Sequence, residues 1–234
     1  MNSTKPSSIK ETFDHIYNDE VWGRYESLSG SGSTIDQTVV LRRELPSILK
    51  SLQARTLLDA PCGDYFWMKE LDLDLDMYIG VDIVQHIVVR NRTRYETPSK
   101  RFLIADITKD PLPRADCILC RACLDHLSLD DCLRALENFR RSGARYLLAT
   151  TYAEREDNPD IITGDFRATN LVQPPFSFPP PLILINEEST EERGLWADKS
   201  MGIWRLEDTP SAVRMGAAFG EKKTPTVRLS KGEN

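Results

Sequence analysis

The sequence contains no long apolar run. Its longest apolar stretches, such as Pro181–Ile185, are far shorter than the roughly 20 residues that a helix needs to cross a bilayer. Its first ten residues are polar and lack the apolar core of a secretory signal. Both absences favour a cytoplasmic protein. The five cysteines, an odd number in a chain without an export signal, then fit reduced thiols better than disulfides.

The chain also lacks an excess of positive charge. Thirty Lys and Arg residues stand against 36 Asp and Glu, which gives a formal net charge of −6 at pH 7. A protein of this sign has no overall attraction to phosphate backbones or anionic lipid. We therefore expect no nucleic-acid partner and no membrane partner, and we leave the oligomeric state open. The length of 234 residues, 40% of them hydrophobic, suits an α/β domain with a real core.

Glycine-rich phosphate loops are missing as well. The turn after the first expected strand, Ala60–Asp64, contains one glycine, whereas a dinucleotide fingerprint needs G-x-G-x-x-G. Pro61 has no amide hydrogen to offer a pyrophosphate. No G-K-[ST] sequence follows a strand, so a Walker A loop is absent too. These absences disfavour NAD, FAD and nucleoside triphosphates, and a nucleotide-dependent oxidoreductase is kept only as a rival interpretation.

Short apolar segments alternate with helical ones through the middle of the chain. Strands are expected over 56–60, 77–83, 101–107, 115–120 and 145–151, helices over 85–95 and 129–141, and a helix start at 66–68. This alternation predicts an α/β fold: a Rossmann-like, doubly wound, mostly parallel sheet with helices on both faces. Two later apolar segments, 182–185 and 202–206, read as a closing pair of strands.

The chain divides into three parts by composition. Residues 1–38 form an N-terminal cap and loop segment with a short helix, and their Gly/Ser stretch 27–34 reads equally well as a flexible linker. Residues 39–209 hold the main domain, which opens with a helix that Pro46 is expected to kink or restart. Residues 210–234 are rich in small and basic residues and are expected to be a poorly ordered tail.

Three acids fall at three successive strand ends, and they are the main functional clue. Ligands of open parallel sheets bind outside the carboxyl ends of the strands. Asp82 follows Gly63 by 19 residues, the spacing of an acid that accepts hydrogen bonds from a ribose diol. Asp59 precedes that glycine turn, and Asp106 stands where it can receive an adenine amino group. Each acid alone could be a helix cap or a loop carboxylate, but three in register indicate an adenosyl ligand.

Four segments together resemble the class I S-adenosylmethionine-dependent methyltransferases. They are Leu57–Gly63 (LLDAPCG), Tyr78–Ile83 (YIGVDI), Leu103–Ile107 (LIADI) and Cys117–Leu127 (CILCRACLDHL). The resemblance runs from about Leu45 to Tyr152, nearly half of the chain. It implies S-adenosyl-L-methionine as the cofactor and methyl transfer as the reaction, without a metal.

The resemblance also implies a role for individual residues. Those implied to contact the cofactor are Asp59, Ala60, Cys62 and Gly63 around its methionine part, Asp82 and Ile83 at the ribose, Asp106 and Ile107 at the adenine, and Arg121 below the sulfonium. The sequence departs from the family in its first motif, because Cys62 and Asp64 stand where glycines are common.

His126 is the candidate general base. It follows the fourth strand, near the expected place of the acceptor, where a neutral imidazole can take a proton from a hydroxyl or amine. The alternative is a histidine that caps a helix or is satisfied in the core, and neighbouring Asp125 is a candidate cap for the helix beginning near Ser128. The C-x-x-C-x-x-C spacing beginning at Cys117 suggests a metal site, but alternation along a strand disfavours it.

The expected function is therefore in-line methyl transfer to a small polar acceptor. The polar stretch 152–170 follows the last parallel strand on the ligand side, where it is either an acceptor site or a solvated excursion. A non-catalytic adenosyl- or nucleotide-binding module with the same fold remains an alternative. The sequence identifies neither the acceptor nor the atom that is methylated.

Overall fold

The strands form one seven-stranded sheet in the order β3-β2-β1-β4-β5-β7-β6. The computed structural model describes residues 8–23, 25–211 and 215. The strands are β1 (Thr56–Asp59), β2 (Met77–Asp82), β3 (Lys100–Ile104), β4 (Cys117–Cys120), β5 (Tyr146–Tyr152), β6 (Ile183–Asn186) and β7 (Lys199–Arg205). Strands β1 to β5 pair in parallel, whereas β7 runs antiparallel to both β5 and β6. The mostly parallel sheet and its closing pair of strands are as predicted.

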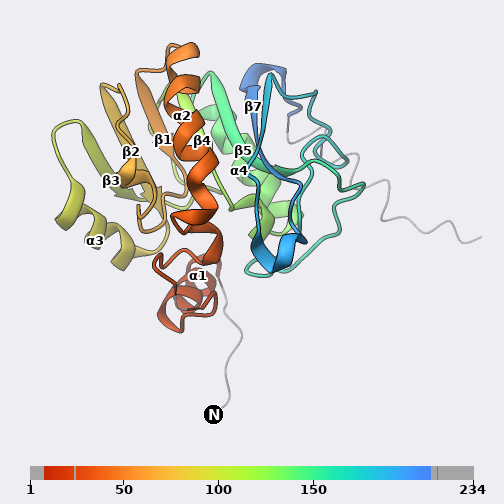
Figure 1. Cartoon of the computed structure of the whole chain (residues 1–234), viewed down its shortest axis with the longest axis horizontal. Coiled ribbons are helices and arrows are strands. Elements are labelled where there is room, and N and C mark those ends of the chain that lie inside the picture. Colours follow the sequence, from red (N-terminus) through yellow and green to blue (C-terminus); the bar gives the residue numbers. More distant parts are fainter. Residues whose placement is uncertain (1–7, 24, 212–214, 216–234) are drawn as a thin grey trace, which may run out of the picture.

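Helices cover both faces of the sheet, which confirms the doubly wound layering. The α-helices are α1 (Ile9–Asn18), α2 (Val39–Ser51), α3 (Gln85–Tyr95) and α4 (Leu129–Arg141). On one face, Leu45 of α2 packs in a core cluster with Leu57. On the other, Phe139 of α4 packs with Leu58, the next residue of the same strand. In Figure 1, α2 lies in front of the sheet and α4 behind it.

Two crossovers lack the α-helix that strict alternation would place there. The expected helix start at 66–68 is wrong, since only a 3₁₀ turn (Met68–Glu70) lies between β1 and β2. Leucines and aspartates alternate from Leu71 to Asp76, and this period of two leaves the leucines packed on the core in extended chain. Between β3 and β4, Pro111 and Pro113 prevent a helix. Helix α2 does not restart at Pro46, which lies inside it.

The Gly/Ser stretch is docked against the sheet and is not a flexible linker. Ser27 is fully buried and donates its hydroxyl to Asp64 at 3.0 Å, and the Leu28 amide donates to the same carboxylate at 2.8 Å. The chain before α2 is thereby fixed to the turn after β1. In Figure 1, α1 lies below the lower end of α2. None of the helices in the described part of the chain is long and apolar enough to cross a bilayer.

The expected C-terminal tail falls mostly outside the described residues. Pro210, Ser211 and Met215 are described, and the Met215 side chain is buried in the core cluster that α4 forms with the sheet. The last residues that pack on this core therefore extend beyond β7.

Gly80 lets the turn after β1 approach β2. A Cβ atom at this position would lie 2.8 Å from the Phe102 ring and 2.9 Å from the Cys62 sulfur. Both neighbours are buried, so neither can move away freely. The absence of a side chain at Gly80 therefore permits the close packing that holds the turn at the edge of the sheet.

We predict that Gly80→Ala lowers the free energy of unfolding by about 1–3 kcal/mol, because the added methyl overpacks this contact. Chemical denaturation measures the loss. The loss of stability should be smaller in a Cys62→Ala background, since that variant removes the sulfur that lies 2.9 Å from the added methyl group. A loss below about 0.5 kcal/mol for Gly80→Ala would contradict the packing argument.

Candidate functional site

A pocket opens at the carboxyl edge of the sheet, beside the ends of β1, β2, β3 and β4. The order of the strands reverses between β1 and β4, which is where parallel sheets bind ligands. Of the residues expected at the site, Asp59, Cys62, Gly63, Asp82, Ile83, Asp106, Ile107, Arg121 and His126 line this pocket. Ala60 does not line it; its side chain is fully buried and its amide donates to the Leu119 carbonyl at 2.8 Å.

Asp82 joins the end of β2 to the turn after β1. Its carboxylate accepts from the Gly63 amide at 3.0 Å and from the Val84 amide at 2.9 Å. Burial raises the pKa of Asp82 to about 6, although these backbone hydrogen bonds act in the opposite direction. Backbone amides therefore hold the Asp82 carboxylate in a buried position where it has lost its contact with water.

Gly63 is the residue on which the shape of the turn depends. Its φ of +51° lies in the left-handed region, and a Cβ atom there would come within 2.3 Å of the Ser29 hydroxyl. Only glycine fits both the backbone angle and the close approach of the Gly/Ser stretch. Gly63 is the only glycine of the turn Ala60–Asp64, and it lies at the position where the backbone requires one.

Asp59 ends β1 inside the pocket, and no ion pair to it is formed by the described residues. The Tyr78 hydroxyl donates to its carboxylate. Burial raises the pKa of Asp59 to about 7, while the hydrogen bond from Tyr78 and the nearby Arg121 lower it. The pocket thus contains two acids, Asp59 and Asp82, whose ionised forms are disfavoured by burial.

Asp106 lies just beyond β3, which ends at Ile104, earlier than expected. One carboxylate oxygen accepts from the Thr108 amide at 2.9 Å and from the Thr108 hydroxyl at 2.6 Å. The other lies 3.2 Å from the Lys109 ammonium. Asp106 therefore shapes its own turn, as the loop-carboxylate interpretation expects, while also lining the pocket.

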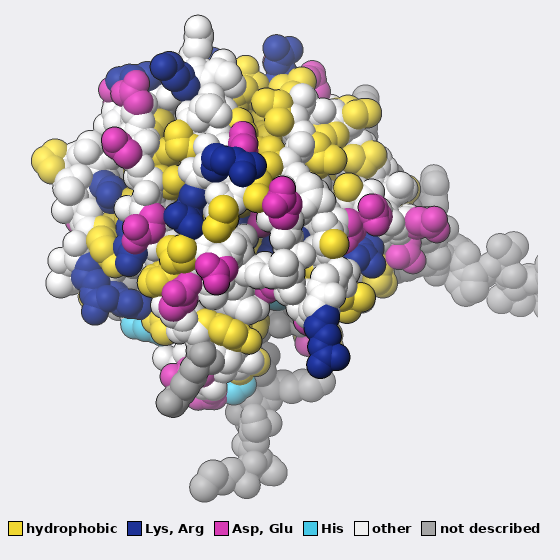
Figure 2. Space-filling view, in the orientation of Figure 1, with side chains coloured by type: hydrophobic (Ala, Val, Ile, Leu, Met, Phe, Trp, Pro, Cys, Tyr) yellow, Lys and Arg dark blue, Asp and Glu magenta, His cyan; other side chains and the backbone are white. Residues whose placement is uncertain are grey.

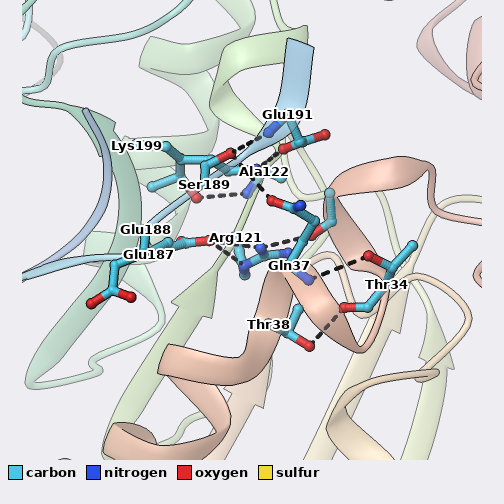
Figure 3. Close-up of polar contacts among 12 residues, drawn as sticks. Thr34, Gln37, Thr38, Arg121, Ala122, Glu187, Glu188, Ser189, Glu191 and Lys199 are labelled. Carbon is cyan, nitrogen blue, oxygen red and sulfur yellow. Dashed lines mark hydrogen bonds and ion pairs between the residues drawn. The ribbon is translucent and has the colours of Figure 1, made fainter. Parts of the chain in front are cut away.

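The Arg121 guanidinium is committed to protein groups. It donates to Glu187 at 2.7 Å and to the Gly32 carbonyl at 2.8 Å, and both charged side chains are almost fully buried. Figure 3 shows Arg121 reaching from the end of β4 toward Glu187 and toward the Gly/Ser stretch. Arg121 therefore ties the pocket wall together.

The N-terminal segment supplies pocket residues that the sequence analysis missed. Ile9, Phe13 and Tyr17 of α1 and Trp22 after it line the pocket. Tyr17 is 3.0 Å from the Ser29 hydroxyl, and the Trp22 and Tyr17 rings pack with centroids 5.5 Å apart. The sequence predicts only a short helix in this segment, and local spacing carries no information about which distant residues such a helix covers.

A second pocket adjoins the first. The two share the lining residues Trp22, Ser29, Ser33, Ala122 and His126. The second pocket extends to Tyr152 at the end of β5, to Phe166 of the polar stretch 152–170, and to Lys199 of β7. The polar stretch therefore lines a pocket on the ligand side.

His126 lies on the wall between the two pockets. Its Nδ1 atom is 2.9 Å from the Asp165 carbonyl oxygen. Because a carbonyl oxygen only accepts, Nδ1 must carry the hydrogen, which leaves Nε2 of the neutral ring free to accept a proton. Trp22 and Phe166 flank the imidazole, with ring centroids 5.0 and 5.6 Å away.

The charges of the first pocket suit a cation better than a pyrophosphate. Four aspartates line it, and Arg121, which is paired with Glu187, is its one lining Lys or Arg among the described residues.

The cysteine spacing that suggested a metal site does not form one. Cys117 and Cys120 belong to the cores on opposite faces of the sheet. Within residues 8–23, 25–211 and 215, no group of three or more His, Cys, Asp or Glu could hold a metal ion.

Comparison with solved structures finds methyltransferases at low identity. The methyltransferase domain of a bacterial Hen1 protein is 16% identical with a TM-score of 0.44, and the match covers 50% of this chain and 66% of that one. An amino pentose methyltransferase from Micromonospora echinaspora is 16% identical at a TM-score of 0.43, covering 50% and 51%. Magnesium protoporphyrin IX methyltransferase from Synechocystis is 13% identical at 0.43, covering 61% and 71%.

A family model gives the more specific result. No curated protein matches the sequence. Residues 58–146 match a model described as a methyltransferase domain, a segment that runs from β1 into β5. It includes the strand ends that carry Asp59, Asp82 and Asp106. Residues 58–146 of this chain therefore match a methyltransferase domain, in agreement with the resemblance found in the sequence.

Proposed function

We propose that this chain transfers a methyl group from S-adenosylmethionine, held in the first pocket, to a small polar acceptor in the second. The observation that carries the proposal is the wall common to both pockets, formed by Trp22, Ala122 and His126 among others. Methyl transfer needs donor and acceptor side by side and in line, which two adjoining pockets provide.

The residues of the first pocket fit this cofactor chemically. When bound, S-adenosylmethionine supplies an electrophilic methyl group on a positively charged sulfur. Asp82 would accept hydrogen bonds from the ribose hydroxyls and Asp106 from the adenine amino group, while Asp59 would lie near the methionine part. A cationic ligand also offsets the cost of the buried acids, whereas a pyrophosphate would add to it.

His126 would accept a proton from the acceptor through Nε2. Its Nδ1–H is held by the Asp165 carbonyl, which fixes both the ring and its tautomer. The Phe13, Tyr17 and Trp22 rings would exclude water from the junction of the pockets. The reaction would then depend mainly on alignment, with proton removal adding to the rate.

The exposed surface supports a small acceptor. On the face drawn in Figure 2, basic and acidic side chains are interspersed, with no continuous basic stripe among the described residues drawn there. An extended nucleic acid needs such a stripe to bind its phosphates. The second pocket, lined by aromatic and polar side chains, suits a small molecule instead.

We predict that Asp82→Asn weakens S-adenosylhomocysteine binding at pH 7.5 by on the order of 10- to 100-fold, because a charged acceptor for the ribose is lost. Isothermal titration calorimetry measures the affinity. In the wild-type protein, affinity should fall as the pH drops below about 6, where Asp82 becomes protonated.

The difference in pH-dependent affinity between the wild-type protein and Asp82→Asn gives the contribution of Asp82 alone. Asp59, whose pKa is raised to about 7, titrates in both. The variant should unfold at nearly the same temperature as the wild type, since relief of a buried charge offsets one lost backbone hydrogen bond. Equal affinity of the two proteins at pH 7.5 would show that the ribose is not bound at Asp82.

A second prediction separates an enzyme from a binding module. Incubation with S-adenosylmethionine carrying a labelled methyl group and a small-molecule extract should release S-adenosylhomocysteine and label a product. His126→Gln should lower this rate by about 10²- to 10⁴-fold and leave S-adenosylhomocysteine affinity unchanged. Tight binding without turnover would support the non-catalytic alternative. Binding of NADH in place of S-adenosylhomocysteine would support the oxidoreductase.

A further inference from the structure

Two of the charged side chains that line the second pocket pair with each other. Lys199 lies 2.9 Å from Glu191, which also accepts from the Ser31 hydroxyl at 2.6 Å. Glu187, close by, is paired with Arg121. Figure 3 shows these two ion pairs between the strand ends and the Gly/Ser stretch. Three further acids line the pocket without a recorded ion pair among the described residues: Asp165 and Glu192, which are exposed, and Asp125, which is buried.

Asp125 lines the second pocket without an ion-pair partner among the described residues. It is only 3% exposed. One carboxylate oxygen accepts a long hydrogen bond, 3.5 Å, from the Tyr152 hydroxyl, and the other has no hydrogen-bond partner in the described part of the chain. It is not the expected helix cap, because the Ser128 hydroxyl caps α4 by accepting from the Asp131 amide. A buried carboxylate in this state is costly unless something binds it.

Aromatic rings surround the same pocket. Tyr152, Phe166 and Trp196 form a contiguous group, with Phe166 and Trp196 centroids 4.9 Å apart, and Trp22 lines the pocket beside His126. The Arg155 guanidinium already lies over the Trp196 ring, at 5.2 Å from its centroid. Ring faces attract cations, and ammonium ligands are commonly bound by several rings together with a carboxylate.

From the unpaired Asp125 carboxylate and these rings, we infer that the second pocket binds a small molecule with a protonated amino group, and that this amine is the methyl acceptor. That the amine is methylated rests on the proposed function. That the pocket binds an amine rests only on Asp125 and the aromatic rings.

The transfer balances if the amine is first deprotonated. The bound ammonium gives one proton to Nε2 of His126, which frees the nitrogen lone pair. That lone pair forms the new nitrogen–carbon bond while the carbon–sulfur bond breaks and its electrons remain on sulfur. The products are a methylammonium, which is again a cation suited to the pocket, and neutral S-adenosylhomocysteine. No oxidant or reductant takes part.

The test compares two probes of nearly equal shape, benzylamine and benzyl alcohol. Only the first is charged at pH 7.5. Each is titrated calorimetrically into the protein saturated with S-adenosylhomocysteine, and quenching of tryptophan fluorescence, to which Trp22 and Trp196 contribute from the pocket, gives a second signal. Benzylamine should bind at least about tenfold more tightly.

Two variants locate the preference. Asp125→Asn keeps the side-chain shape and a partner for Tyr152, and it should weaken benzylamine by on the order of 10- to 100-fold while changing benzyl alcohol by less than about threefold. Asp157→Asn removes the same charge from an exposed acid that lines neither pocket. It should leave both affinities unchanged.

The outcomes separate this inference from the proposed function. Equal binding of the two probes to the wild-type protein would overturn the amine site even if Asp125→Asn failed to fold. A preference that survives in Asp125→Asn would also overturn it. Failure of S-adenosylhomocysteine to bind, with the amine preference and its loss in Asp125→Asn intact in the protein alone, would contradict the proposed function and leave the amine site standing.

Discussion

The burial of carboxylates at one edge of the sheet, with few cations beside them, is the constraint on which the site depends. Folding brings Asp59 and Asp82 out of water, and this burial raises the pKa of both carboxyl groups. The backbone offsets part of the cost, because the turn at Gly63 donates to Asp82. Under the proposed function, a cationic ligand that also donates hydrogen bonds would offset the remainder. Such sites are less stable than they could be, which is typical of places kept for function.

The N-terminal segment depends on the same edge. Asp64 accepts from Ser27 and Leu28, and this anchor sets the Gly/Ser stretch against the turn after β1. Helix α1 then lines the first pocket, and Trp22 lines both pockets. Arg121 ties the same stretch to Glu187, close to the start of the β6–β7 connection. The wall between the pockets is therefore built from segments far apart in the sequence, held by buried polar groups.

The fold and the strand-end residues of the first pocket could be predicted from the sequence because their signals are local. An apolar strand that ends in an acid is visible within six residues, and the spacing from Gly63 to Asp82 is fixed by one crossover. The helices over 85–95 and 129–141 have the predicted bounds, whereas the crossover between β1 and β2 was harder to predict. The alternating leucines between β1 and β2 have the period of extended chain, and this pattern outweighed the apolar start at Phe66.

The second pocket was not readable, because its parts meet only after folding. Trp22, Asp125 and Trp196 belong to three segments with no common motif. Asp125 looked like a cap since it precedes a helix, and only the geometry assigns that role to Ser128. His126 was proposed from its position after β4, whereas its tautomer follows from a carbonyl 39 residues later in the chain. Contacts between residues so far apart in the chain leave no periodic pattern in the sequence.

A crystal structure of the protein with S-adenosylhomocysteine would test the central claim most directly. We expect the ribose hydroxyls on Asp82 and the adenine near Asp106. The sulfur should be directed toward Ala122 and His126, which form part of the wall between the two pockets. The ligand bound elsewhere, or bound with its sulfur turned away from that wall, would contradict it.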